Sequence, residues 1–212
     1  MSNALRITLI LLVAAAGAAA GLWLGRDRTP RPLPLEHATL FAAPRPLPAF
    51  TLVDHEGREF GPDRLLGRWS ILFFGFTNCP DVCPSTLATL AAARRELADL
   101  PPDAQPAVYL VSVDPARDTA ARLGDYVRFF DPAFTGVTGT PASIEALTSA
   151  LGVVVIVNAP DAAGNYSVDH SASLFLVNPA GALAGTFGAP HTPDGITHDY
   201  RLIVDAAGPH RS

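Results

Sequence analysis

The stretch that decides the fold is "WSILFFGFTNCPDVCPSTL", residues 69–87, which holds both cysteines of the chain, Cys79 and Cys83. Its first part, residues 69–76, is an uninterrupted apolar and aromatic run that predicts a buried central strand. A helix is predicted over 85–100, where leucines recur at helical spacing. The cysteines are therefore expected in a loop at the carboxyl end of a central strand, where open α/β sheets place their ligands.

Strands and helices alternate along the rest of the chain. A hairpin is predicted at 50–60, around Glu56-Gly57, and a second one turns at residues 178–181. Further strands are predicted at 107–115, 153–158 and 171–187, and further helices at 118–130, 143–152 and 193–207. This order predicts an α/β fold with a thioredoxin-like central sheet flanked by helices.

The chain before the sheet divides into two segments. Residues 7–24 carry no charge, and as a helix they would span about 27 Å, close to the thickness of a bilayer core. We therefore expect a membrane anchor or signal segment over 1–28, with an anchor helix favoured. Six prolines over 29–48 predict an extended proline-rich linker. The domain itself is then expected to occupy 49–212.

Charge and the apolar segment bear on location. The net charge of −5 argues against a nucleic-acid partner. Arginines flank the apolar segment on both sides, so the positive-inside rule does not settle its orientation. We expect a single-pass protein of the inner (cytoplasmic) membrane whose domain faces the periplasm or the cell exterior.

The cysteine pair allows three interpretations. A disulfide would close a loop too short to add much stability. A redox couple is possible, although the spacing is one residue longer than the C-x-x-C of dithiol oxidoreductases. A metal clamp is the third, because two thiolates on one turn can converge on one ion. Pro84 is expected to keep Cys83 extended just before the helix, and the helix N-terminus favours thiolate in both cysteines. The loop alone does not choose among the three.

Two thiolates leave a metal site incomplete, and His170 is the best candidate for a third ligand. It stands in "YSVDHSASLFLV", at the entry to an apolar strand, from which thioredoxin-like folds reach the cysteine loop. Oxidoreductases of that fold usually carry a proline there, and residues 171–173 contain none. Asp169 is a candidate to orient the imidazole, and Asp81 is expected to point outward. The other histidines are predicted to be surface residues: His37, His55, His191, His198 and His210.

Three motifs together resemble the Sco (SenC) family of copper chaperones: "FGFTNCPDVCPSTL", "VSVDPARDT" and "YSVDHSASLFLVNPAG". The resemblance covers about residues 48–207. It implies that Cys79, Cys83 and His170 bind one copper ion, Cu⁺ or Cu²⁺. It also implies that an N-terminal helix holds the protein to a membrane and that the protein serves assembly of the binuclear copper site of cytochrome c oxidase. Asp114 and Asp118 belong to the second motif and are not predicted to be ligands.

The chemistry of the candidate ligands agrees with this resemblance. Two soft thiolates and an imidazole suit copper, with zinc as the physical competitor. The leading hypothesis is a copper-binding metallochaperone that delivers copper to, or prepares, the binuclear copper site of cytochrome c oxidase. Its expected partners are the copper-bearing subunit of that oxidase, or another copper acceptor, and a thiol reductant.

The alternative is a membrane-anchored thiol–disulfide oxidoreductase acting on the cysteines of an acceptor protein. It needs Cys79 and Cys83, the redox-active candidates, but not His170. No residue is assigned a catalytic role, and whether the protein is an enzyme stays open. A peroxiredoxin-like peroxidase would leave the second cysteine and the histidine unexplained, and a redox sensor is physically possible.

Overall fold

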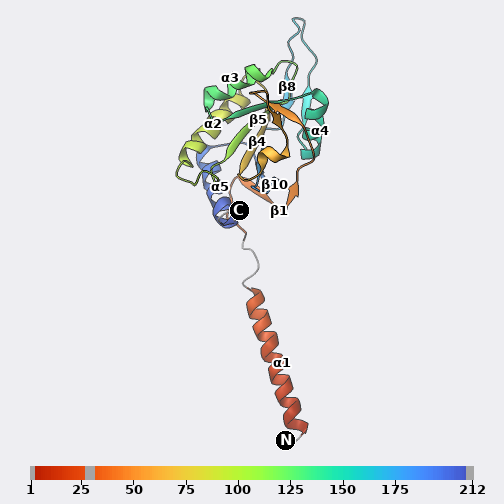
Figure 1. Ribbon diagram of the computed structural model, residues 1–212, viewed down its shortest axis with the longest axis vertical. Coiled ribbons are helices and arrows are strands. Elements are labelled where there is room, and N and C mark those ends of the chain that lie inside the picture. The colour runs from red at the N-terminus through yellow and green to blue at the C-terminus, as the bar shows by residue number, and fades with distance from the viewer. Residues whose placement is uncertain (1–2, 27–31, 209–212) are drawn as a thin grey trace. The chain divides into compact units, whose positions relative to one another are not determined.

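The computed structural model describes residues 3–26 and 32–208 and divides the chain into two compact units, Met1–Pro34 and Leu35–Ser212. The first unit contains helix α1 (Asn3–Arg26) (Figure 1). Within the described part of the chain, no helix combines the length and apolarity that crossing a membrane requires. Both ends of the predicted anchor segment, 1–2 and 27–28, lie outside the described residues, and the anchor stays a prediction.

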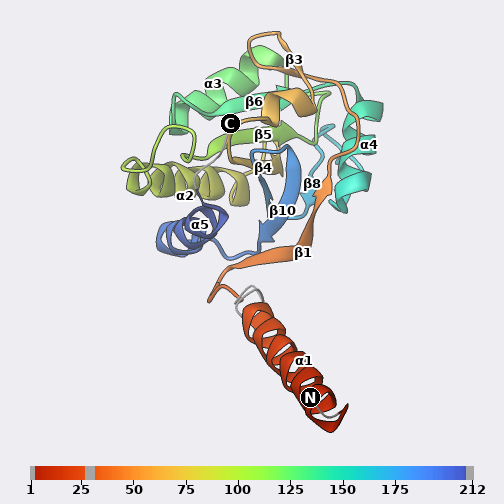
Figure 2. The same cartoon turned by 60° about the horizontal axis from the view of Figure 1, so that its bottom comes forward.

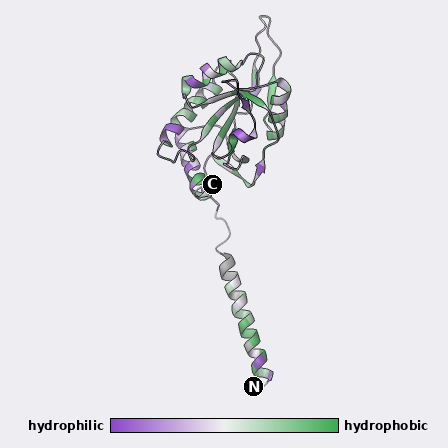
Figure 3. Ribbon diagram, viewed as in Figure 1, coloured by the Kyte–Doolittle hydropathy of each residue, from purple (hydrophilic) through white to green (hydrophobic). Residues whose placement is uncertain are grey.

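The second unit is built on an eight-stranded sheet of order β1-β10-β9-β4-β5-β6-β2-β3. At its centre, β4 (Ser70–Gly75) pairs in parallel with β5 (Ala107–Ser112), and β5 with β6 (Thr135–Thr138). On its other side β4 pairs antiparallel with β9 (Leu174–Val177). Every residue of β4 is buried, as predicted for a strand covered on both faces. Figure 3 shows the hydrophobic residues gathered in these central strands.

Helices cover both faces of this sheet (Figures 1 and 2). On one face lie α2 (Val82–Glu96), α3 (Ala120–Phe130) and α5 (Pro193–Ala207), and on the other lies α4 (Pro141–Leu151). Local signals set their ends: the Thr119 side chain caps α3, and Gly152 stops α4 with a φ of +73°. The mixed α/β, thioredoxin-like architecture predicted from the sequence is confirmed.

Strand β1 (Ala38–Pro46) differs from the prediction. It pairs antiparallel with β10 (Ala182–Phe187), where an added Cβ on Gly185 would lie 2.4 Å from the carbonyl oxygen of Thr39. The buried carboxylate of Asp199 accepts the backbone N–H of His37 at 2.7 Å and of Ala38 at 2.6 Å. Residues 38–46, expected in a linker, therefore belong to the domain. The prolines do favour extended chain, and an edge strand accommodates them.

The remaining elements show smaller differences. The first hairpin is β2 (Leu52–Asp54) with β3 (Glu59–Phe60), as predicted, followed by a 3₁₀ turn over Pro62–Leu65. Strand β6 was not predicted, and neither was β8 (Val168–His170), which pairs with β7 (Val155–Val157) in a separate two-stranded ribbon. Helix α2 begins at Val82 rather than residue 85. Cys83 is thus helical and not extended, because a proline in the first turn removes an N–H that has no helical partner.

Candidate metal centre

The two cysteines lie at the junction between β4 and α2. The N–H of Cys79 donates to the carbonyl oxygen of Phe76 at 3.3 Å, which turns the loop back toward the strand. The N–H of Cys83 donates to Sγ of Cys79 at 3.4 Å. Both residues are free cysteines; Cys79 is partly exposed and Cys83 is fully buried. Asp81, between them, is exposed and makes no side-chain cap, as expected of a residue that points outward.

His170 reaches the cysteines from the end of β8. Its Nε2 lies 3.4 Å from Sγ of Cys83, and the ligand atoms of Cys79, Cys83 and His170 all lie within 4.8 Å of one another. Metal–ligand bonds of about 2.0–2.3 Å place the donors of one ion about 3.5–4 Å apart, so three atoms this close can hold one ion after small shifts. Among the described residues, no other group of histidine, cysteine and acidic side chains has this geometry.

The backbone and two aromatic rings orient the imidazole. Nδ1 of His170 lies 3.1 Å from the carbonyl oxygen of Ser171, so Nδ1 carries the proton and Nε2 presents its lone pair to the cysteines. The rings of Phe73 and Phe76 stand edge-on to the imidazole, with centroids 6.0 and 5.8 Å away. The carboxyl of Asp169, suggested as the orienting group, instead accepts a hydrogen bond from Asn158 Nδ2 at 2.9 Å.

Burial is the largest influence on the protonation of Cys83 and His170. It raises the pKa of the Cys83 thiol well above its ordinary value, and the neighbouring Cys79 and the charge of Asp118 act in the same direction. Burial also lowers the pKa of His170, against the opposing effect of the Ser171 carbonyl. At neutral pH the centre therefore holds a Cys83 thiol and a neutral imidazole. The expectation that the helix N-terminus makes Cys83 a thiolate is wrong, because desolvation outweighs the helix dipole here.

Four of the other five histidines lie in the described part of the chain, and none of these four belongs to the ligand group. His55 accepts the N–H of Gly136 through Nδ1 at 3.0 Å, between β2 and β6. His191 Nε2 lies 2.7 Å from the carbonyl oxygen of Ala172, and His198 Nδ1 lies 2.9 Å from Asp199. His37 is exposed at the start of β1, and His210 lies outside the described residues.

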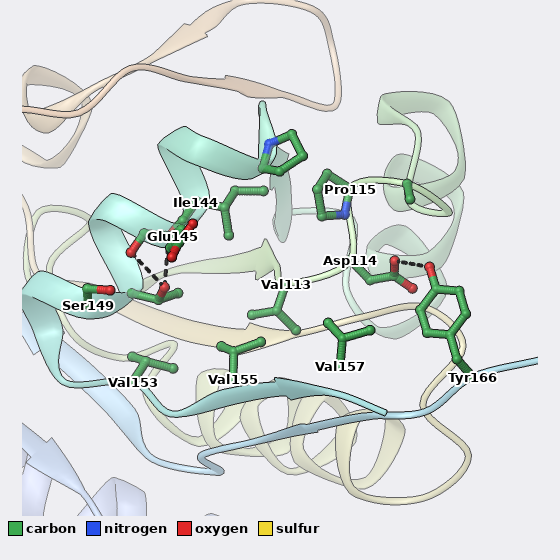
Figure 4. Close-up of a pocket in the computed structure, with 13 residues that line it drawn as sticks. Val113, Asp114, Pro115, Ile144, Glu145, Ser149, Val153, Val155, Val157 and Tyr166 are labelled. Carbon is green, nitrogen blue, oxygen red and sulfur yellow. Dashed lines mark hydrogen bonds between the residues drawn. The ribbon is translucent and has the colours of Figure 1, made fainter. Parts of the chain in front are cut away.

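A hollow of about 450 Å³ lies beside the ribbon that carries His170 (Figure 4). Its walls come from α4, from β7 and from the loop after β5, and they are mostly apolar. None of the three candidate ligands lines it. The candidate metal ligands Cys79, Cys83 and His170 thus lie outside this hollow.

Several residues around the centre were not identified from the sequence. They are the aromatic neighbours Phe73 and Phe76, the carbonyl of Ser171, and four residues that contact the cysteine loop or the ribbon carrying His170: Thr77, Ser112, Arg117 and Tyr166. All of them except Phe73 lie inside the three quoted motifs, so membership of a motif was the available signal. Neither hydrophobic periodicity nor residue type distinguishes them from ordinary core or surface residues.

Comparison with known proteins agrees with this architecture. A family model described as SCO1/SenC matches residues 42–205. A protein of Stutzerimonas stutzeri that is named for copper binding is 38% identical over 207 residues, covering 96% of this chain and 97% of its own. The crystal structure of Arabidopsis thaliana ScoI with copper bound superposes with a TM-score of 0.68 at 32% identity, covering 76% of this chain and 96% of the other. For Bradyrhizobium japonicum ScoI with copper bound the TM-score is 0.66 at 31% identity, with 74% and 98% covered.

Proposed function

The chain belongs to the SCO1/SenC family, and from that premise we propose that it is a copper-binding metallochaperone. In this proposal it delivers copper to, or prepares, the binuclear copper site of cytochrome c oxidase. The observation that carries the proposal is the convergence of Cys79, Cys83 and His170 within 4.8 Å. Support also comes from the Arabidopsis and Bradyrhizobium relatives, whose structures hold copper, and from the description of Sco proteins as cytochrome c oxidase assembly proteins.

The donor set fits copper as cargo. Two thiolate sulfurs and one imidazole nitrogen are soft to intermediate ligands, which copper prefers to the oxygen donors that suit magnesium or calcium. The imidazole is already neutral and its lone pair faces the sulfurs, so binding needs no change at His170. Cys83 must give up its proton when the ion binds, because thiolate and not thiol is the ligand. Three protein ligands leave room for a ligand of an acceptor protein to attach before one of the three lets go.

The first experiment measures copper binding by the purified full-length protein, reduced and then loaded with Cu(I) and Cu(II) in separate samples. We expect one copper per chain and thiolate-to-copper charge-transfer absorption. His170→Ala should weaken the binding or alter the spectrum, whereas His198→Ala, which removes a half-exposed imidazole from α5, should leave both unchanged. A wild-type protein that retains no copper would overturn the proposal.

The second experiment tests delivery. The copper-loaded protein is mixed with the metal-free, reduced copper-bearing domain of cytochrome c oxidase, and the copper in each is measured after separation. We expect copper to move to the oxidase domain, which should then show the absorption of its own copper site. If copper stays on this protein with the oxidase domain in excess, the delivery role is wrong and copper binding alone remains.

A thiol–disulfide oxidoreductase is the second candidate, favoured by the partly exposed Cys79 just before α2. In that reaction the Cys79 thiolate attacks an acceptor disulfide and releases one acceptor thiol. Cys83 then attacks the mixed disulfide, releases the second thiol and leaves a Cys79–Cys83 disulfide, which an external dithiol reduces. This activity should be indifferent to His170→Ala. An acceptor disulfide reduced at the same rate by wild type and variant, together with no stable copper, would favour this function instead.

We propose further that the domain acts outside the cytoplasm, held by the N-terminal segment. The support is the uncharged run over 7–24 in the sequence. A reporter enzyme that folds only outside the cytoplasm, fused after Ser212, should be active. Activity confined to a cytoplasmic reporter at the same position would refute this location.

A further inference from the structure

We propose that the segment Asp114–Asp118, between β5 and α3, sets the spacing between the two cysteines and His170. The segment contributes no ligand. One of its ends binds the loop that carries Cys79, and the other binds the ribbon that carries His170. Asp114, Arg117 and Asp118 are therefore positioning residues for the metal centre. The inference rests on the proposed copper-binding function and adds to it the residues that set the distance between the cysteines and His170.

Asp118 holds the cysteine loop. Its carboxyl group is fully buried and accepts the backbone N–H of Thr77 at 3.1 Å and the Thr77 hydroxyl at 2.5 Å. The hydroxyl of Ser112, the last residue of β5, donates to the same group at 2.7 Å. Thr77 lies two residues before Cys79, so these bonds fix the path of the loop just ahead of the first sulfur. On the outer side, Arg122 of α3 donates to Thr77 Oγ1 at 2.8 Å and to Asn78 Oδ1.

Asp114 and Arg117 hold the ribbon. The hydroxyl of Tyr166, just before β8, donates to Oδ1 of Asp114 at 2.7 Å (Figure 4). Arg117 pairs with the other carboxylate oxygen of Asp114 and donates to the Tyr166 carbonyl at 3.0 Å. Its guanidinium also stacks on the Tyr166 ring, 3.6 Å from the centroid. Tyr166 is thus held through its hydroxyl, its ring and its backbone, four residues before His170.

These contacts matter because the ribbon lies outside the main sheet. Strands β7 and β8 pair with each other and not with the main sheet. The side chains of Val155 and Val157 face the hollow of about 450 Å³ rather than a packed neighbour. Hydrogen bonds to charged groups are stronger than bonds between neutral groups. Asp114 and Arg117 therefore supply a fixed point for the ribbon that pairing with the main sheet does not provide.

The two ends of the segment are themselves joined. The N–H of Asp118 donates to the carbonyl oxygen of Asp114 at 3.0 Å, and the N–H of Asp114 donates to the Ser112 hydroxyl at 3.0 Å, the group that also binds Asp118. The guanidinium of Arg117 lies 5.7 Å from the centroid of Phe76, whose ring packs against the imidazole of His170. A short, rigid turn thus connects both halves of the centre.

The test separates the two halves with one variant on each side. Tyr166→Phe keeps the ring on Arg117 and removes the bond to Asp114, and Asp118→Asn weakens the hold on Thr77. Amide hydrogen exchange is measured on the reduced, metal-free, full-length protein. In Tyr166→Phe we expect exchange to accelerate about tenfold over residues 167–171 and to stay unchanged over 76–80, since only the ribbon loses a hydrogen bond to a charged group. In Asp118→Asn we expect the reverse.

The copper-loaded proteins supply the second readout. Nitrogen coupling in the spectrum of the Cu(II) form reports on His170, and thiolate charge transfer reports on the cysteines. We expect Tyr166→Phe to weaken the nitrogen coupling and to keep the charge-transfer band, and Asp118→Asn to alter the band. Thr77→Val removes the hydroxyl that bonds to Asp118 and Arg122 but keeps the backbone N–H bond to Asp118, and it takes the place of Asp118→Asn if that variant does not fold.

Two control variants remove similar interactions far from the centre. Tyr109→Phe removes a 3.5 Å bond to the Arg64 carbonyl. Asp131→Asn breaks a pair with Arg94 whose arginine is as exposed as Arg117. Both controls should leave both readouts unchanged.

Three results would overturn the inference. The first is amide exchange that rises equally over 167–171 and 76–80 in both variants. The second is exchange that rises as much in the two control variants. The third is a nitrogen coupling in Tyr166→Phe that equals that of the wild type. Each of these leaves copper binding by the wild type intact, so the proposed function would survive. A wild type that binds no copper refutes the proposed function, and the exchange of the metal-free variants still decides whether the segment positions the two halves.

Discussion

Replacing Gly75 by alanine should disturb the metal centre without touching a ligand. Gly75 is the last residue of β4, and a Cβ added there would lie 2.9 Å from Sγ of Cys83. The same methyl would lie 3.1 Å from Cδ1 of Leu110 and 3.2 Å from Cε1 of Phe73, so it is enclosed on three sides. Comfortable contacts between such atoms begin near 3.5 Å, so the sulfur or the strand must move by about 0.6 Å.

That movement sets the expected magnitudes. Adding a methyl group to a packed core costs about 1–3 kcal/mol in the free energy of unfolding. Metal sites specify ligand distances to within about 0.2 Å, so a sulfur displaced by about 0.6 Å should lower copper affinity at least tenfold. Gly188→Ala is the matched control, because a Cβ at that position has no atom within 4 Å and the backbone φ is not in the left-handed region.

The assay has two parts. Urea unfolding of the reduced, metal-free, full-length protein gives the change in stability, and competition with a Cu(I) indicator gives the change in affinity. Gly188→Ala should match wild type in both. The reasoning is refuted if Gly75→Ala unfolds within 0.5 kcal/mol of wild type and binds Cu(I) equally well, since the close packing around Cys83 would then be absent in solution.

Three further predictions follow from named contacts. Burial opposes ionisation of Asp199, but hydrogen bonds from His198 and from the start of β1 outweigh it and lower its pKa, so this carboxylate stabilises the fold above about pH 4 and loses that effect as pH falls. Asp199→Asn should therefore cost about 2–4 kcal/mol in urea unfolding at pH 7 and progressively less as the pH falls below about 4, whereas Asp99→Asn, in an exposed ion pair, should cost much less at pH 7. A loss for Asp199→Asn that does not change as the pH is lowered would contradict this. Because burial raises the pKa of the Cys83 thiol, Cu(I) binding should release its proton, and affinity should rise from pH 6 to 8; calorimetry in buffers of different ionisation enthalpy that detects no released proton would be evidence against it. Gly185→Ala should separate β1 from β10 and speed amide exchange in both strands, and unchanged exchange there would show that the strands tolerate a side chain.

Much of the fold was predictable because its signals are local. The buried run over 69–76 became β4, Thr119 caps the start of α3, Gly152 stops α4, and the second hairpin turns at residues 178–181 as predicted. Each of these depends on residues within a few positions of one another, through periodicity, capping or backbone conformation. The candidate ligands could also be identified from the sequence, because the chain has few cysteines and histidines and each candidate lies beside a recognisable strand.

Other features depended on parts of the chain that meet only after folding. The proline-rich residues of β1 read as a linker because their partners, β10 and Asp199, lie about 140 to 160 positions later. The helix dipole predicted a Cys83 thiolate, and only the packing around the sulfur showed that desolvation prevails.

The sequence by itself thus determined most elements of the domain, their order and the three candidate ligands, because each of these is encoded by neighbouring residues. Tertiary structure alone decided how those ligands are held together. Asp118 meets Thr77 across 41 positions, and Asp114 meets Tyr166 across 52. No local pattern specifies such a pairing, because it depends on the distance between elements that the whole sheet places in space.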